Sequence, residues 1–89
     1  MSASEIKVIH NIDKNRFEVQ LDSYTAELNY YRSDAAITFT HTGVPFEIEG
    51  RGIGSLLVKA GLEYARSNKL KVRSHCWFVD QYMQRHPKE

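Results

Sequence analysis

The sequence predicts an α+β fold in which an antiparallel sheet packs against one long helix. Three observations lead to this prediction. Four segments in the first half of the chain are rich in β-forming residues and separated by short turns, which is typical of an antiparallel meander. Residues 53–64 then carry apolar side chains at helical spacing. A short strand and a short helix follow, so we expect about five strands and two helices.

The predicted meander consists of four strands, at residues 5–10, 16–21, 24–32 and 35–42. The second strand is the clearest, because Phe17, Val19 and Leu21 fall on one of its faces and polar residues fall on the other. The connections between the strands are short and rich in Asn, Asp and Ser, which favour turns. Strands joined in this way pair with their neighbours in sequence.

The long helix is predicted near residues 52–67, where the apolar period changes from two to about 3.6. Its apolar stripe consists of Ile53, Leu56, Leu57, Ala60 and Tyr64, and the stripe is widened by Val58, Leu62 and Ala65. A strand is expected near residues 70–75, and a second helix at residues 77–85, which Pro87 stops.

Length and composition predict a single domain over residues 1–89. An apolar content of 42% supports one small core, and the single cysteine, Cys76, cannot form a disulfide within the chain. Such cysteine usage favours a reducing, cytoplasmic location. The first residues lack the pattern of a secretion signal, and no apolar run approaches the roughly 18 residues of a membrane span, so we expect no membrane partner.

Charge is divided unevenly along the chain, although the net charge is only +1. Residues 1–50 carry a net charge of −4 and residues 51–89 carry +5. A basic second half suits a polyanionic ligand, although the halves of a small domain also differ in charge by chance. Nothing in this pattern favours a nucleic-acid partner.

Three glycines, Gly50, Gly52 and Gly54, stand at the entrance of the predicted helix. One interpretation is a tight turn with close helix packing. The other is a close approach of an anionic ligand to the N–H groups at the helix start. The spacing fits neither the phosphate-binding loop of nucleotide triphosphatases nor the dinucleotide-binding fingerprint. The glycines alone leave both interpretations open.

A longer stretch resembles a known family. The segment HTGVPFEIEGRGIGSLLVKAGLEYARSNKLKV, followed by CWFVDQYMQRHP, is similar to the small YjdJ-type branch of the GNAT superfamily of N-acetyltransferases. The superfamily signature Gln/Arg-x-x-Gly-x-Gly/Ala falls on Glu49, Gly52 and Gly54. The resemblance covers residues 41–87. It implies a GNAT-like fold whose fifth strand splays from the fourth near Val44, so that the sheet is mixed there.

The resemblance also implies that acetyl-CoA is the cofactor, used as a co-substrate, with its pyrophosphate on the amides of the glycine loop. The residues that would contact it are Thr42, Val44, Glu49, Gly50, Arg51, Gly52, Ile53, Gly54, Ser55, Cys76, Tyr82, Arg85 and His86. Glu49 departs from the family, because a carboxylate repels a pyrophosphate unless it turns outward. Arg51, two residues later, would restore a positive charge.

Two side chains are candidates for catalysis. Cys76 matches a cysteine of the branch and would act as a nucleophile or as a proton donor to the departing thiolate, whereas a lone cysteine is often only a buried apolar residue. His41 alternates with Ile37 and Phe39, so it is expected on the apolar side of the sheet. There it would be a hydrogen-bonded core residue or a base. The spacing of histidines and Cys76 does not favour a metal site.

The predicted function is therefore transfer of acetyl from acetyl-CoA to an amine, either a small amine or a protein lysine or terminus, by a monomer. The alternative is a CoA-binding or interaction module of the same fold that lacks efficient transfer, because 89 residues leave little chain to enclose an acceptor. A third class, a small RNA-binding domain, would show salt-sensitive binding of RNA, and nothing in the sequence favours it.

Overall fold

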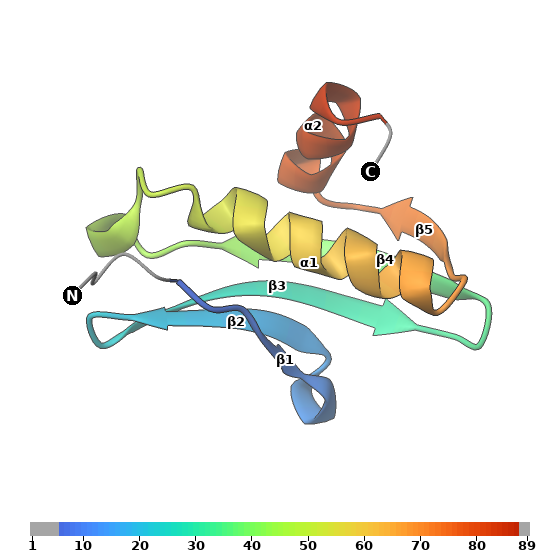
Figure 1. Ribbon diagram of the computed structural model, residues 1–89, viewed down its shortest axis with the longest axis horizontal. Coiled ribbons are helices and arrows are strands. Elements are labelled where there is room, and N and C mark those ends of the chain that lie inside the picture. Colours follow the sequence, from blue (N-terminus) through green and yellow to red (C-terminus); the bar gives the residue numbers. More distant parts are fainter. Residues whose placement is uncertain (1–5, 88–89) are drawn as a thin grey trace.

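The computed structural model describes residues 6–87, in which one face of a five-stranded sheet is covered by a long helix (Figure 1). The strands are β1 (Ile9–Asn11), β2 (Arg16–Leu21), β3 (Tyr24–Arg32), β4 (Ala36–Gly43) and β5 (Lys71–Ser74). The helices are α1 (Ile53–Ser67) and α2 (Trp77–Arg85), with short 3-10 turns η1 (Ile12–Lys14) and η2 (Phe46–Ile48). The strands lie in chain order, β1 to β4 antiparallel and β5 parallel to β4. The predicted mixed α+β fold is confirmed.

The elements follow the sequence-based bounds closely, except for the first strand. It was expected at residues 5–10 but spans Ile9–Asn11, and residue 5 lies outside the described residues. The apolar side chains of Ile6 and Val8 pack against the core without forming sheet hydrogen bonds. The alternation of apolar residues before Ile9 therefore reflects partial burial and not pairing with a strand of the sheet. The two 3-10 turns were not predicted.

Helix α1 lies across the sheet so closely that one position must be glycine. An ideal Cβ on Gly61 would lie 2.8 Å from the Phe39 ring, and both residues are buried. The helix buries Ile53, Leu57, Val58, Leu62 and Ala65. Leu56, which was expected in the apolar stripe, is 37% exposed. The buried side of α1 thus includes Val58, Leu62 and Ala65, which were expected to widen the stripe, and also Gly61, which was not expected there.

Strand β4 contains a β-bulge that reverses the facing of its last residues. Asn29 pairs with His41 but Tyr30 pairs with Phe39, so Thr40 is an extra residue in β4. Beyond the bulge, Thr42 pairs with the buried Leu28 and lies on the α1 side. His41 is exposed on the opposite face. The prediction that His41 lies on the apolar side is therefore wrong, because the extra residue shifts the alternation by one.

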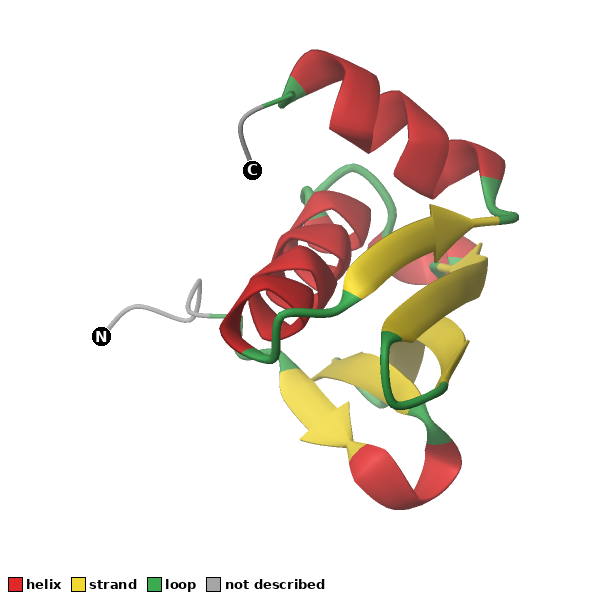
Figure 2. Ribbon diagram, turned by 90° about the vertical axis from the view of Figure 1, so that its right-hand side faces the viewer, coloured by secondary structure: helices red, strands yellow, loops and turns green. Residues whose placement is uncertain are grey.

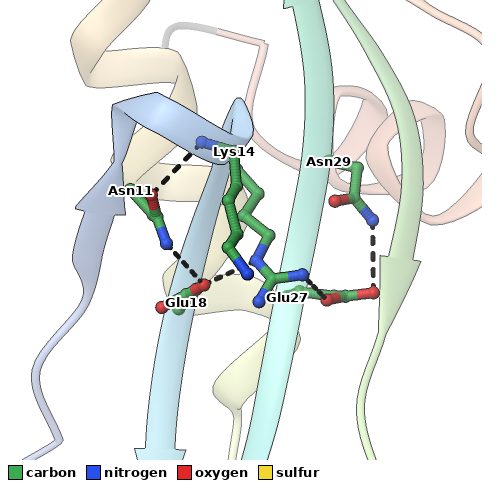
Figure 3. Close-up of polar contacts among 6 residues, drawn as sticks. Asn11, Lys14, Glu18, Glu27 and Asn29 are labelled. Carbon is green, nitrogen blue, oxygen red and sulfur yellow. Dashed lines mark hydrogen bonds and ion pairs between the residues drawn. The ribbon is translucent and has the colours of Figure 1, made fainter.

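The face of the sheet opposite α1 carries a network of charged and amide side chains (Figure 3). We call it the polar face, and it includes Arg16, Glu18, Glu27, Asn29 and His41. Arg16 Nε donates to Glu18 at 2.5 Å, and Arg16 Nη1 donates to Glu27 at 2.9 Å. Asn29 Nδ2 donates to Glu27 at 3.3 Å. One guanidinium group thus joins two carboxylates on neighbouring strands.

Glu18→Gln is expected to lower Tm by about 3–5 °C at pH 7. The hydrogen bond from Arg16 holds the pKa of Glu18 below its usual value, against the opposing effect of burial. A carboxylate with a lowered pKa stabilises the fold above about pH 4.5, and this contribution disappears as the pH falls through the folded-state pKa. The difference in Tm between variant and parent should therefore be smaller at pH 3 than at pH 7. An equal difference at both values would contradict this account. Glu63→Gln, on the exposed side of α1, is the control.

Candidate functional site

Strands β4 and β5 separate part way along their length. Their pairing ends at Phe39 and Ser74, after which His75 N donates to Phe39 O at 2.9 Å. Strand β4 continues to Gly43, while the chain after β5 turns away into α2 (Figure 2). Residues 40–43 consequently have no β5 partner within the described chain. The splay expected near Val44 is confirmed, and it leaves backbone groups of β4 available along one edge.

A cleft of about 640 Å³ lies beside this edge, between the end of β4, the glycine loop and the start of α1. Its lining consists of Thr42, Gly43, Val44, Ile48, Glu49, Gly50, Gly52, Ile53, Gly54, Ser55 and Phe78. Eight of these belong to the predicted cofactor contacts. Gly43, Ile48 and Phe78 were missed. Gly43 and Ile48 lie next to predicted contacts in the sequence, so they could have been predicted from their neighbours. Nothing in the sequence indicated that Phe78 would line the cleft.

The start of α1 faces the cleft with unbonded N–H groups. The first hydrogen bond of the helix runs from Leu56 N to Gly52 O at 3.1 Å. Within the described residues no side chain caps the helix start, and its first turn contains no acidic residue. The N–H groups of residues 53–55 and the positive end of the helix dipole therefore form a position suited to an anion.

The three glycines have two different roles. Gly50 and Gly52 have φ of +83° and +74°, in the left-handed region that favours glycine, and a Cβ on either would meet nothing within 4 Å. Gly54 is helical, and its ideal Cβ would lie 2.8 Å from the Phe78 ring of α2. The close helix packing of the first interpretation is found at Gly54, whereas the approach of an anionic ligand at Gly50 and Gly52 stays a prediction. The first two glycines shape an open loop, and Gly54 allows the helices to pack closely.

Cys76 contacts Thr42, a residue of the cleft wall, but does not itself line the cleft. Its Sγ is 3.3 Å from Thr42 Oγ1, within hydrogen-bonding distance, and the residue is 8% exposed. Cys76 N donates to Ser74 Oγ at 3.1 Å, which fixes the turn from β5 into α2. The thiol is therefore close to the splayed edge of β4 and shielded from solvent.

His41 does not join Cys76. It lies on the polar face, with Nε2 3.2 Å from the position of an ideal Cβ on Gly43. Cys76 contacts Thr42 on the other side of the same strand. The two predicted catalytic side chains thus flank the end of β4 from opposite faces, and they cannot act as a directly bonded pair.

The remaining predicted contacts surround the cleft. Tyr82, Arg85 and His86 line a smaller hollow that shares Ser55 and Phe78 with it. The rings of Tyr82 and His86 stack with centroids 4.3 Å apart. Arg51 instead forms an exposed ion pair with Asp22 at 3.4 Å, an arrangement that contributes little stability and can be exchanged for another anion.

Two absences concern residues 6–87, the part of the chain that the structure describes. In this range no three side chains of His, Cys, Asp or Glu are placed to hold a metal ion. No helix in the same range is long and apolar enough to cross a membrane.

The chain belongs to the GCN5-related N-acetyl-transferase family, whose sequence pattern matches residues 16–89. The resemblance to the GNAT superfamily is thereby confirmed, while the YjdJ-type branch stays a prediction. Protein NATD1 of Xenopus tropicalis is 32% identical over 88 residues, which cover 96% of this chain and 81% of that protein. Protein NATD1 of Homo sapiens is 33% identical over 85 residues, covering 92% and 75%.

A solved structure shares the fold. The NMR solution structure of a GCN5-like N-acetyltransferase candidate from Staphylococcus aureus superimposes with a TM-score of 0.67. Its sequence is 34% identical, and the match covers 97% of this chain and 83% of that one. The predicted GNAT-like fold is confirmed by this similarity.

Proposed function

We propose that this protein transfers the acetyl group of acetyl-CoA to an amine in the cleft between β4 and α1. The observation that carries the proposal is the alignment of two features along one cleft. Uncapped N–H groups of residues 53–55 stand at one end, and the unpaired edge of β4 stands at the other. A pyrophosphate suits the first and an extended amide-containing arm suits the second.

In this proposal the glycine loop binds the pyrophosphate. The absence of side chains at Gly50 and Gly52 lets phosphate oxygens approach the backbone. The pantetheine arm forms hydrogen bonds with β4 near Thr42 and Val44, in the place that a fifth-strand residue would otherwise occupy. Arg85 and His86 then lie beside the cofactor's remaining polar groups. The exposed Glu49 carboxylate also lines this cleft, so the proposal requires it to turn away from the phosphates when acetyl-CoA binds.

The chemistry is an acyl transfer. A neutral amine nitrogen attacks the thioester carbonyl carbon, a C–N bond forms and the C–S bond breaks. The sulfur leaves with the electron pair and takes up a proton from Cys76, while the proton that the amine loses passes to solvent, from which the thiolate of Cys76 is reprotonated. Backbone N–H groups near Val44 polarise the carbonyl oxygen. The Cys76 thiol, held beside Thr42 at the splayed edge, donates the proton to the departing thiolate. Its burial favours this role over nucleophilic attack.

The proposal is tested by incubating the protein with acetyl-CoA and a panel of small amines and lysine peptides. We expect acetylated product and free CoA thiol in equal amounts, formed only when both substrates are present. Tight binding of acetyl-CoA without product across the panel would overturn it. That result would favour the alternative, a CoA-binding module of the same fold.

Location and assembly are part of the same proposal. A monomeric cytoplasmic protein would meet acetyl-CoA and keep the buried thiol of Cys76 reduced. Sedimentation at micromolar concentrations, with and without acetyl-CoA, should give the mass of a single chain.

A further inference from the structure

A second hollow lies on the polar face, next to the end of β4. It has a volume of about 310 Å³ and is lined by Thr25, Glu27, Gly43, Val44 and Pro45. Gly43 and Val44 also line the main cleft, so the two depressions meet at the same two residues of the chain. A molecule in this hollow would be adjacent to the part of β4 beside which the proposed function places the thioester.

The hollow has a carboxylate in its wall. Glu27 and Glu18 are directly opposite each other in the β2–β3 register, an arrangement that destabilises a sheet when both are charged. Arg16 bonds to both, so two carboxylates share one directly bonded guanidinium. The Glu18 side chain is 7% exposed and that of Glu27 is 31% exposed. Glu27 Oε1 accepts from Arg16 and Oε2 accepts from Asn29, and with 31% of its side chain exposed Glu27 is the carboxylate of this pair that lines the hollow.

His41 stands at the edge of the same hollow. An ideal Cβ on Gly43 would lie 3.2 Å from His41 Nε2 and 3.9 Å from Glu27 Cγ. The β-bulge at Thr40 is what turns His41 to this face. An imidazole and a carboxylate thus flank Gly43, one of the two residues that the hollow shares with the cleft.

We infer that the acetyl acceptor enters from the polar face and carries two amino groups, one of which Glu27 binds as an ammonium ion. This inference rests on the proposed function and names its substrate class. A carboxylate holds an amine in its protonated, unreactive form, so Glu27 does not serve the attacking nitrogen. Glu27 instead binds the second amino group, which stays protonated throughout the reaction. The attacking nitrogen reaches the carbonyl carbon past Gly43 and gives its proton to His41.

The test compares 1,4-diaminobutane with n-butylamine, which has the same carbon chain but a single nitrogen. We expect the parent protein to favour the diamine by at least tenfold in kcat/KM. Glu27→Gln should reduce this preference to about threefold or less, mainly by raising KM for the diamine, and should leave KM for acetyl-CoA unchanged. Glu18→Gln is the matched control, because it removes the neighbouring charge from the same network without lining the hollow. It should retain the preference.

The inference is overturned if the parent uses both amines equally, or if Glu18→Gln and Glu27→Gln reduce the preference alike. A titration of the CoA-bound protein with the diamine, followed by amide chemical shifts, separates this failure from failure of the proposed function. Shifts at Thr25 and Gly43 that disappear in Glu27→Gln, without any acetylated product, would keep the diamine site and reject the transfer activity. Acetylation without such shifts would reject the site and keep the activity.

Discussion

Gly52→Val is expected to weaken acetyl-CoA binding by at least tenfold. Gly52 has φ of +74°, and a β-branched residue in this region is strained by roughly 1–3 kcal/mol. The loop must then change its path, and the added side chain also projects into the space that the phosphates would occupy. Titration calorimetry with acetyl-CoA gives the affinity, and thermal unfolding reports any loss of stability.

Gly52→Asn is the control that separates strain from steric exclusion. Asparagine adopts the left-handed conformation more readily than valine, so the loop should keep its path and the fold its stability. We still expect weaker binding, because any Cβ atom now stands between ligand and backbone. Parent-like affinity in both variants would show that the ligand does not contact this loop.

Cys76→Ala is expected to slow acetyl transfer by about a hundredfold while acetyl-CoA binds as before. The reason is the loss of the proton donor, the Cys76 thiol, whose Sγ lies 3.3 Å from Thr42 Oγ1. Cys76→Ser keeps a hydroxyl at the same place and should recover part of the rate. Single-turnover kinetics, which follow the chemical step separately from binding, provide the measurement.

Mass spectrometry of the parent protein with acetyl-CoA alone distinguishes the two chemical roles of the thiol. A proton donor gives no covalent adduct, whereas a nucleophile accumulates an acetylated chain. Transfer by Cys76→Ala at the parent rate would instead show that the thiol only packs, and that backbone polarisation suffices.

Local sequence patterns predicted most of the fold because the strands and α1 have clear and different periods. Strands β2 and β3 and helix α2 have the expected bounds, and β4, β5 and α1 are displaced by only one residue at their ends. These elements are each half buried, so a repeating apolar face is a direct consequence of their packing. In the segment before β1 an apolar alternation does not correspond to a strand, because Ile6 and Val8 are partly buried but do not pair with a neighbouring strand.

The candidate site was harder to predict because it depends on local irregularity. The bulge at Thr40 changes the face of the sheet on which the side chains of His41 and Thr42 lie. The alternation of apolar residues, which does not reveal the bulge, assigns both side chains to the wrong face. It is this reversal that brings Thr42 to Cys76 and leaves His41 beside the second hollow. A single extra residue leaves no mark in hydrophobic periodicity, because Thr occupies many positions of a strand.

The glycine cluster shows a similar limit. The glycine spacing left two interpretations open, and only the family resemblance pointed to all three glycines as ligand contacts. The tight packing of Gly54 on Phe78 depends on where α2 lies, and a short amphipathic helix does not encode its own position. The role of each glycine therefore followed only from the tertiary structure.

The most direct test of the central claim is a titration of isotope-labelled protein with acetyl-CoA, monitored by amide chemical shifts. The largest shifts are expected at Val44 and at residues 50–55, saturating together with one dissociation constant. Arg85 and Phe78 should follow with smaller changes. If acetyl-CoA binds while the amides of residues 50–55 remain unchanged, the ligand occupies another place and the proposed site is wrong.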